Sequence, residues 1–198
     1  MEIVDLTAPL CPGPAAHPGD PRVRFVRTRS HEADGYEVTR ISLGSHSGTH
    51  LDAPRHFFPV GATLDQYPVD RLVGPGVVVD CRPAPGDRGI DAALLAERLH
   101  PDCVPPGGFV LLWAEGVLLS VEAARLLLEA GAGLVGTDGP SLDREPYPVH
   151  QLLLGHGVLI AEDLRGLDRL GPGPVTCAFL PLAVVGTDGA PVRAVAWR

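Results

Sequence analysis

The sequence predicts a mixed α/β fold, in which a sheet with some antiparallel pairing forms one compact domain with few helices. Three observations favour this class. Short apolar runs rich in β-branched residues alternate with turns that contain Gly or Pro. Only two stretches have both the length and the end signals of a helix, too few for a regular β-α-β series. The first half of the chain is also rich in strand-like segments, which favours antiparallel neighbours.

Seven segments are predicted to be strands because each is short, apolar and bounded by turn residues. They are 3–6, 38–43, 77–81, 109–113, 134–137, 158–162 and 176–180. The first helix is expected to begin at Asp91, which can cap it, and to end before Pro101. The second is expected to begin at a Ser120 cap and to end at Gly131.

Length and composition indicate one globular domain that spans residues 1–198. A chain of 198 residues can bury one good core and is short for two. Hydrophobic residues make up 45% and charged residues 20%, as in ordinary globular proteins. The 24 Gly and 21 Pro are spread along the chain and mark no linker. The tetrapeptide Gly-Thr-Asp-Gly at 136–139 and again at 186–189 is interpreted as two similar turns.

Charge and residue types exclude several functions. The formal net charge is −8, and all 16 cationic residues are Arg. Without Lys, Schiff-base chemistry and a P-loop are excluded. Neither a basic cluster for nucleic acid nor an apolar run of membrane-spanning length is present, so neither partner is expected. With no secretory signal at the start and four widely spaced cysteines, a reducing cytoplasm is the expected location.

The densest chemical pattern lies between residues 45 and 57, where His46, His50 and His56 surround Asp52. Imidazole and carboxylate groups are the usual ligands of catalytic zinc or manganese, and about three of them leave a position for water. A turn at Gly48 would let His46, His50 and Asp52 converge. The alternative is a surface loop that happens to be rich in histidine.

A second candidate pair is His150 and Glu162. Glu162 follows a run of apolar and small residues that is typical of a buried strand. A buried carboxylate needs a partner, which could be a metal or an arginine. Taken alone, this pair favours a structural interaction over a functional one.

Together the two clusters resemble the cyclase-like metal-dependent amidohydrolases, the family that includes the bacterial kynurenine formamidases (arylformamidases). Five matches in order carry the resemblance: the His-x-x-x-His-x-Asp-x-Pro-x-His-Phe run at 46–57, the His-Pro-Gly-Asp turn at 17–20, the segment 134–143, the spacing of His150 and Glu162, and the segments 178–182 and 190–194. The resemblance covers nearly the whole chain and implies the family's α/β fold, of the swivelling β/β/α type.

The resemblance also implies the metal ligands. His46, His50 and Asp52 would bind a first ion, and Asp52 would bridge to a second ion completed by His150 and Glu162. The expected cofactor is Zn²⁺, as one or two ions, with Mn²⁺ as the alternative. The expected assembly is a homodimer or a larger homo-oligomer.

Two further roles follow from the same resemblance. His56 would donate and accept protons in catalysis, assisted by Glu162 if that carboxylate is not fully engaged as a ligand. His17 replaces a Trp that packs on the aromatic substrate in the family, which makes it a substrate-binding candidate. Asp138, Ser141 and Asp143 could line the pocket or close a turn, and both interpretations stay open.

The function implied is hydrolysis of the carbon–nitrogen bond of a small, aryl amide by a metal-activated water. The family reaction converts N-formylkynurenine to kynurenine and formate, a step of tryptophan catabolism. One alternative is the opening of a cyclic imide or lactam of the isatin type at the same site. An alternative of another class is a metal-binding protein without turnover.

Overall fold

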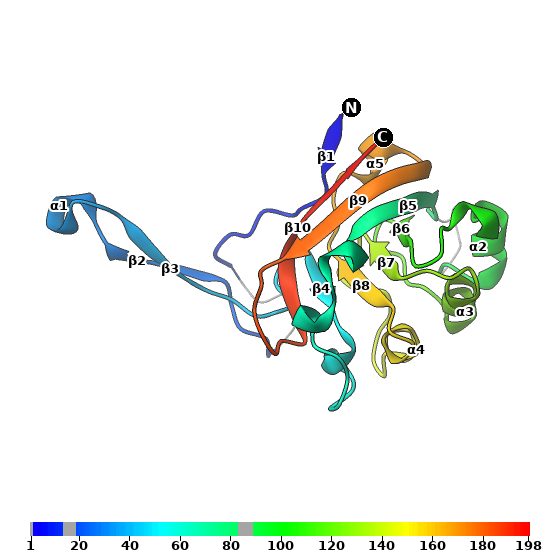
Figure 1. Cartoon of the computed structure of the whole chain (residues 1–198), viewed down its shortest axis with the longest axis horizontal. Helices are drawn as coiled ribbons and strands as arrows, with labels where there is room; N and C mark the ends of the chain where they lie inside the picture. The colour runs from blue at the N-terminus through cyan, green and yellow to red at the C-terminus, as the bar shows by residue number, and fades with distance from the viewer. Residues whose placement is uncertain (1, 14–18, 83–88) are drawn as a thin grey trace.

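An eight-stranded mixed sheet closes on itself and forms the body of the protein (Figure 1). The computed structural model describes residues 2–13, 19–82 and 89–198. The strand order is β1-β10-β4-β8-β7-β6-β5-β9, and β9 pairs again with β10, so the strands from β10 to β9 form a closed, barrel-like sheet. The strands are β1 Ile3–Asp5, β4 His50–Asp52, β5 Val73–Asp80, β6 Phe109–Trp113, β7 Leu134–Thr137, β8 Leu159–Glu162, β9 Gly173–Pro181 and β10 Gly189–Trp197.

The sheet divides into a parallel part and an antiparallel part. β5, β6, β7 and β8 pair in parallel. β4, β9, β10 and β1 join them through antiparallel pairs. The predicted mixed α/β class with antiparallel pairing is therefore confirmed.

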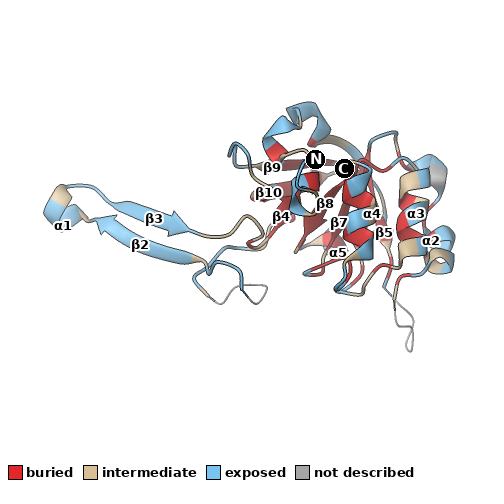
Figure 2. Cartoon of the chain, turned by 90° about the horizontal axis from the view of Figure 1, so that it is seen from below, coloured by how far each residue is buried: buried red, intermediate tan, exposed pale blue. Residues whose placement is uncertain are grey.

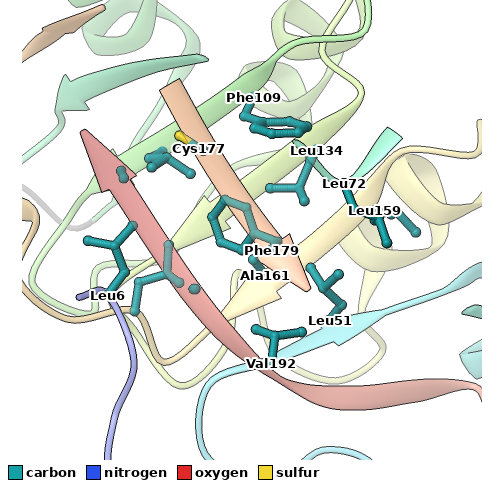
Figure 3. Packing of buried hydrophobic residues seen from close by; sticks show 14 of the residues in the cluster. Leu6, Leu51, Leu72, Phe109, Leu134, Leu159, Ala161, Cys177, Phe179 and Val192 are labelled. Atoms are coloured by element: carbon teal, nitrogen blue, oxygen red, sulfur yellow. The ribbon is translucent and has the colours of Figure 1, made fainter. Parts of the chain in front are cut away.

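Side chains that alternate along the strands fill two cores. On β6, Phe109 and Leu111 point into the closed sheet, where Phe109 meets Phe179 edge to face with ring centroids 5.7 Å apart (Figure 3). Val110 and Leu112 point to the other side and pack with the helices. The parallel strands β6, β7 and β8 are therefore buried on both faces, as expected for strands without polar alternation.

Helices cover the outer side of the parallel strands (Figure 2). They are α2 Ala92–Arg98, α3 Val121–Glu129 and α4 Pro148–Gly155, while α5 Leu167–Leu170 is a single turn before β9. Both predicted helices are confirmed with their caps: the side chain of Asp91 accepts the backbone N–H of Leu94, and that of Ser120 accepts the N–H of Ala123. Within the described residues, no helix has the length and apolar character needed to span a membrane.

The sequence missed several elements. β4 is only three residues long and polar at two of its positions, so it carries no periodic pattern. β10 begins at Gly189 and includes Pro191, both of which argue against a strand, yet it pairs with β9, β4 and β1. The segment is extended because its backbone pairs with these three neighbouring strands, and its own residues would not predict a strand.

A two-stranded arm stands apart from this body (Figures 1 and 2). It consists of β2 Arg24–Arg29 and β3 Val38–Ser42, joined at the tip by α1 His31–Asp34. β3 lies within the predicted strand 38–43, whereas β2 was not expected.

Candidate metal centre

The pairing of β4 with β8 brings the two sequence clusters together. In the antiparallel register His50 lies opposite Glu162, so their side chains point to the same face of the sheet. Asp52, two residues after His50, shares that face, whereas Leu51 between them points into the core. The three-residue strand β4 thus presents two candidate ligands, and its pairing with β8 places a third, Glu162, directly opposite His50.

Helix α4 supplies the next ligand. His150 lies in its first turn, with Nε2 at 3.0 Å from Oε1 of Glu162 and 3.7 Å from Oδ2 of Asp52. His50, Asp52, His150 and Glu162 are each no more than 5% exposed. Burying four ionisable groups together is unfavourable unless they neutralise one another or bind a cation.

The imidazole rings are oriented as in metal-binding histidines, with one nitrogen held by the protein and the other facing the carboxylates. Nδ1 of His50 donates to the carbonyl oxygen of Gly48 at 2.7 Å. Nδ1 of His150 donates to Oδ1 of Asp143 at 2.5 Å. In both rings Nε2 is therefore the nitrogen that faces the cluster.

His46 precedes β4 and approaches Asp52 from the other side. Its Nδ1 lies 2.7 Å from Oδ1 of Asp52, and its Nε2 lies 3.0 Å from Oδ2 of Asp188. Asp188 thus holds Nε2 of His46, the nitrogen that faces away from Asp52, and Asp143 likewise holds Nδ1 of His150, the nitrogen that faces away from Glu162. Each of these rings has a carboxylate behind it, which raises its basicity as a ligand.

One buried nitrogen fits a cation directly. Nε2 of His50 has no hydrogen-bond partner among the described residues, although Asp52 Oδ1 is 3.2 Å and Glu162 Oε2 is 3.5 Å away. Ligand atoms of His50, Asp52 and Glu162 lie within 4.8 Å of one another, and so do those of His46, Asp52 and His56. Asp52 belongs to both groups. The donor set of imidazoles and carboxylates therefore suits zinc or manganese.

In the metal-free protein, protons on His50 and His150 supply positive charge beside the buried carboxylates. Burial lowers the pKa of His50, but the neighbouring Asp52 and Glu162 outweigh it and raise that pKa to about 9. Burial likewise opposes charge on His150, and its bonds to Asp143 and Glu162 raise the pKa to about 10. Because a metal ligand must be neutral imidazole, metal binding must displace these protons.

His56 differs from the buried histidines. It ends the short 3-10 turn Pro54–His56, its ring lies 3.9 Å from that of His46, and its Nδ1 lies 3.3 Å from Oδ2 of Asp188. Burial lowers its pKa, and the nearby His46 adds to this, while Asp52 and Asp188 oppose it. A neutral, partly exposed imidazole beside the ligands can accept a proton near pH 7.

These groups line one cavity of about 350 Å³. Its walls are formed by Asp20, His46, His50, Asp52, His56, Phe57, Pro140, Ser141, Tyr147, His150, Glu162 and Asp163. The rings of Phe57 and Tyr147 meet with centroids 5.6 Å apart and form an aromatic side to the cavity. Tyr147 holds a left-handed backbone conformation with φ of 59°, which for a bulky residue is uncommon outside functional sites.

The six predicted metal and proton-transfer residues, His46, His50, Asp52, His56, His150 and Glu162, all meet in this cavity. Ligand atoms lie close together in two groups, one of His50, Asp52 and Glu162 and the other of His46, Asp52 and His56. This division differs from the first-ion set expected from the sequence, which combined His46, His50 and Asp52. How the ligands are shared between ions stays a prediction. His17 lies outside the described residues, and the neighbouring Asp20 lines the cavity.

The structure also resolves the residues left open. Asp143 holds His150, and Ser141 lines the cavity. Asp138 accepts backbone N–H groups of residues 114, 115 and 116 and closes a turn. Asp188 was missed because its Gly-Thr-Asp-Gly segment was interpreted only as a turn. The repeated tetrapeptide could have drawn attention to Asp188, because the aspartate of each copy, Asp138 and Asp188, accepts hydrogen bonds.

A closed mixed sheet whose wall carries a buried histidine–carboxylate cluster defines an α/β protein built to hold a divalent metal beside a small-molecule cavity. The sequence pattern of the family described as Putative cyclase matches residues 4–144, and the chain belongs to this family.

Relatives and solved structures agree with this placement. The chain is 34% identical to a kynurenine formamidase of Salinibacter ruber, over 98% of this chain and 97% of that protein. A solved structure described as a potential metal-dependent hydrolase with cyclase activity superposes with a TM-score of 0.82 at 31% identity, covering 98% and 96% of the two chains. An isatin hydrolase A from Labrenzia aggregata superposes with a TM-score of 0.85 at 27% identity, covering 98% and 93%.

Proposed function

We propose that this protein is a metal-dependent amidohydrolase that cleaves the carbon–nitrogen bond of N-formylkynurenine or a closely related aryl amide, giving an amine and a carboxylate, which is formate for N-formylkynurenine. The observation that carries the proposal is the convergence of five candidate ligands and His56 on one cavity. The name of the Salinibacter ruber relative supports formamide cleavage in particular.

The proposed cofactor is Zn²⁺, as one or two ions, with Mn²⁺ as the alternative. His46, His50 and Asp52 would hold the first ion, and Asp52, His150 and Glu162 the second. Such an ion lowers the pKa of water toward roughly 7 and polarises a carbonyl group. Two observations support this assignment: Nε2 of His50 is buried without a hydrogen-bond partner from residues 2–13, 19–82 and 89–198, and carboxylates orient His46 and His150.

His56 is the proposed proton carrier. Its Nδ1 faces Asp188, which accepts the Nδ1 hydrogen, so Nε2 keeps the free lone pair. That nitrogen would take a proton from the attacking water and return it to the leaving nitrogen, so that the amine departs neutral. Glu162 would assist, although its Oε1 is already approached by His150 and by the backbone N–H of Leu142.

The aromatic side of the cavity supports an aryl substrate. Phe57 and Tyr147 can contact an aromatic ring through a face or an edge, which is worth about 0.5–1.5 kcal/mol beyond burial. His17 is proposed to contact the same ring. A polar His17 in place of Trp would weaken that packing and broaden the range of substrates.

A cyclic amide such as isatin is the second candidate. The structural likeness to the Labrenzia aggregata isatin hydrolase favours it, and water attack at the same site would open the ring. A metal-binding protein without turnover would need neither His56 nor an open cavity. We further propose that the chain forms one domain, acts in the cytoplasm in tryptophan catabolism, and assembles as a homodimer or larger homo-oligomer.

A substrate panel tests the proposal. The zinc-loaded and manganese-loaded protein is assayed for kcat/KM on N-formylkynurenine, N-formylaniline and isatin, alongside the His17→Trp variant. The proposal expects hydrolysis of the formamides and improved kcat/KM for N-formylkynurenine in His17→Trp. Preference for isatin would establish the second candidate, and bound metal without any hydrolysis would establish the non-catalytic alternative.

A further inference from the structure

A second cavity adjoins the metal cavity at the edge of the sheet where the parallel strands end. Strands β6, β7 and β8 lie side by side (Figure 1), and Trp113 at the end of β6, Asp138 after β7 and Asp163 after β8 all line this cavity. Its volume is about 580 Å³, and Pro140 and Asp163 line the metal cavity as well. Clefts outside the carboxyl ends of parallel strands are common binding positions for small molecules. The second cavity is therefore within reach of a molecule whose reacting group lies at the metal site.

Arg165 supplies the permanent positive charge of the two cavities. The chain contains no lysine, and among the described residues that line either cavity Arg165 is the only arginine. The histidines of the metal cavity become neutral when they bind metal. Away from the metal, the guanidinium of Arg165 is therefore the cation that a carboxylate on the substrate would meet.

The guanidinium of Arg165 is held by one edge and free at the other. Nη1 donates to the carbonyl oxygens of Asp138 at 3.2 Å and Leu164 at 3.3 Å, and Oδ1 of Asp163 lies 3.5 Å from Nη2. Nε has no acceptor within the described part of the chain, and the side chain is 54% exposed. The edge formed by Nε and Nη2 can therefore hold a carboxylate through two parallel N–H···O bonds.

Two exposed acidic side chains line the same cavity. Glu115 follows β6, and Asp168 lies in the first turn of α5. Arg82 lies 3.8 Å from Glu115, but it already pairs with both carboxylate oxygens of Asp80. Among the described residues, the groups of ligand atoms close enough to share a metal ion include neither Glu115 nor Asp168. Separate carboxylates of this kind suit an organic cation, such as a primary ammonium group, better than a metal ion.

We propose that the second cavity binds the α-amino acid group of the substrate, with Arg165 holding its carboxylate and Glu115 and Asp168 its ammonium group. The two charges of such a group lie on one carbon atom, and the cavity presents the complementary charge to each. This inference rests on the proposed function, since N-formylkynurenine carries an α-amino acid group on the chain beside its formamide. Isatin and N-formylaniline carry none, so the second cavity would discriminate between the candidate substrates.

Steady-state kinetics of the metal-loaded enzyme on three formamides tests the proposal. N-formylkynurenine carries both charges, N-formylkynuramine lacks the carboxylate, and N-formylaniline lacks both. Arg165→Met should lower kcat/KM for N-formylkynurenine at least about tenfold relative to N-formylaniline, as expected for a lost hydrogen bond between charged groups. The loss should appear in KM, because this bond forms equally in the bound substrate and in the transition state. N-formylkynuramine should not show it.

Arg169→Met is the matched control for Arg165→Met. Its side chain has the same exposure, 54%, and lines neither cavity, so the ratio of kcat/KM values should stay as in the wild type. Glu115→Gln/Asp168→Asn should lower kcat/KM about three- to fivefold for both compounds that carry the ammonium group, relative to N-formylaniline, while metal content stays unchanged. Asp70→Asn/Glu97→Gln, at two exposed carboxylates elsewhere, is its control.

Calorimetric titration with product compounds tests the second cavity without turnover. Kynurenine should bind the metal-loaded wild type at least about tenfold more tightly than 2-aminoacetophenone, which lacks the amino acid group, and Arg165→Met should remove most of this advantage. Equal affinity for the two compounds would overturn the proposal. So would equal losses of kcat/KM on N-formylkynurenine and N-formylaniline in Arg165→Met, an equal effect of Arg169→Met, or loss of metal in Glu115→Gln/Asp168→Asn.

The two measurements separate this inference from the proposed function. If no formamide is hydrolysed but kynurenine keeps its advantage in binding, the hydrolase proposal fails and the amino acid site stands. If the formamides are hydrolysed and Arg165→Met behaves as Arg169→Met does, the hydrolase proposal stands and the amino acid site is refuted.

Discussion

Asp143 holds His150 by the nitrogen that faces away from the other candidate ligands, with Oδ1 at 2.5 Å from Nδ1. The second carboxylate oxygen of Asp143 accepts the backbone N–H of Val149 at 2.6 Å, so it ties the ring to the first turn of α4. A carboxylate in this position fixes both the tautomer and the orientation of a metal-binding imidazole.

Replacing Asp143 should therefore weaken metal binding without removing a ligand. Asp143→Ala should lower zinc affinity at the site that includes His150 by roughly 10- to 100-fold, the usual effect of losing such a partner. Competition with a chromophoric chelator measures the affinity, and Asp70→Asn, at an exposed carboxylate, is the control. Unchanged affinity in Asp143→Ala would show that His150 binds no metal.

His50→Ala should abolish high-affinity metal binding, because it removes the buried nitrogen that has no hydrogen-bond partner in the part of the chain that the structure describes. Chelation of the wild type should abolish activity, and zinc or manganese should restore it. Metal bound only to the folded state also stabilises it, by about 2.7 kcal/mol at a concentration 100 times the Kd. Urea unfolding with and without metal measures this gain, with the exposed His100→Ala as control. Full activity in demonstrably metal-free protein would refute the metal centre.

His56→Ala separates proton transfer from metal binding. The variant should keep its metal and its fold while kcat falls by a factor of about 10² to 10⁴, the usual contribution of a general acid–base group. Metal analysis by mass spectrometry is decisive here, because His56 also lies within ligand distance of His46 and Asp52. If the variant loses an ion, His56 is a ligand and its assigned role is wrong.

Metal binding should release protons at neutral pH. In the metal-free protein the pKa of His50 is about 9 and that of His150 is about 10, so both are charged at pH 7 and must become neutral to bind. Filling both positions should release about two protons, which calorimetry in buffers of different ionisation enthalpy measures. Heats that are independent of the buffer would contradict the raised pKa values.

The same two histidines set the pH dependence of the metal-free fold. Their folded-state pKa values lie above the unfolded value of 6.5, so their contribution to stability is complete below that pH. It is lost as the pH rises through about 9 to 10. The free energy of unfolding of the metal-free protein should accordingly fall across this range. Metal-loaded protein should not show that loss, because its histidines are already neutral.

The sequence by itself determined the features that depend on residues close together along the chain. Asp91 and Ser120 cap their helices with their own side chains, and both starts were predicted. His46, His50 and Asp52 fall within seven positions, so a short turn and a short strand suffice to gather them. Apolar strand segments such as 109–113 were predictable because burial on both faces leaves a continuous apolar run.

Only the tertiary structure decided which distant groups complete the site. β4 is too short to carry a pattern of its own, and its pairing with β8 is what sets Glu162 opposite His50. Asp188 reaches His46 from 142 positions away, because β10 closes the sheet beside β4. Strand pairing and register arise from the packing of the whole sheet, since they are decided by long-range contacts rather than by local conformational preference. Asp188 could therefore be assigned to His46 only once the sheet had closed.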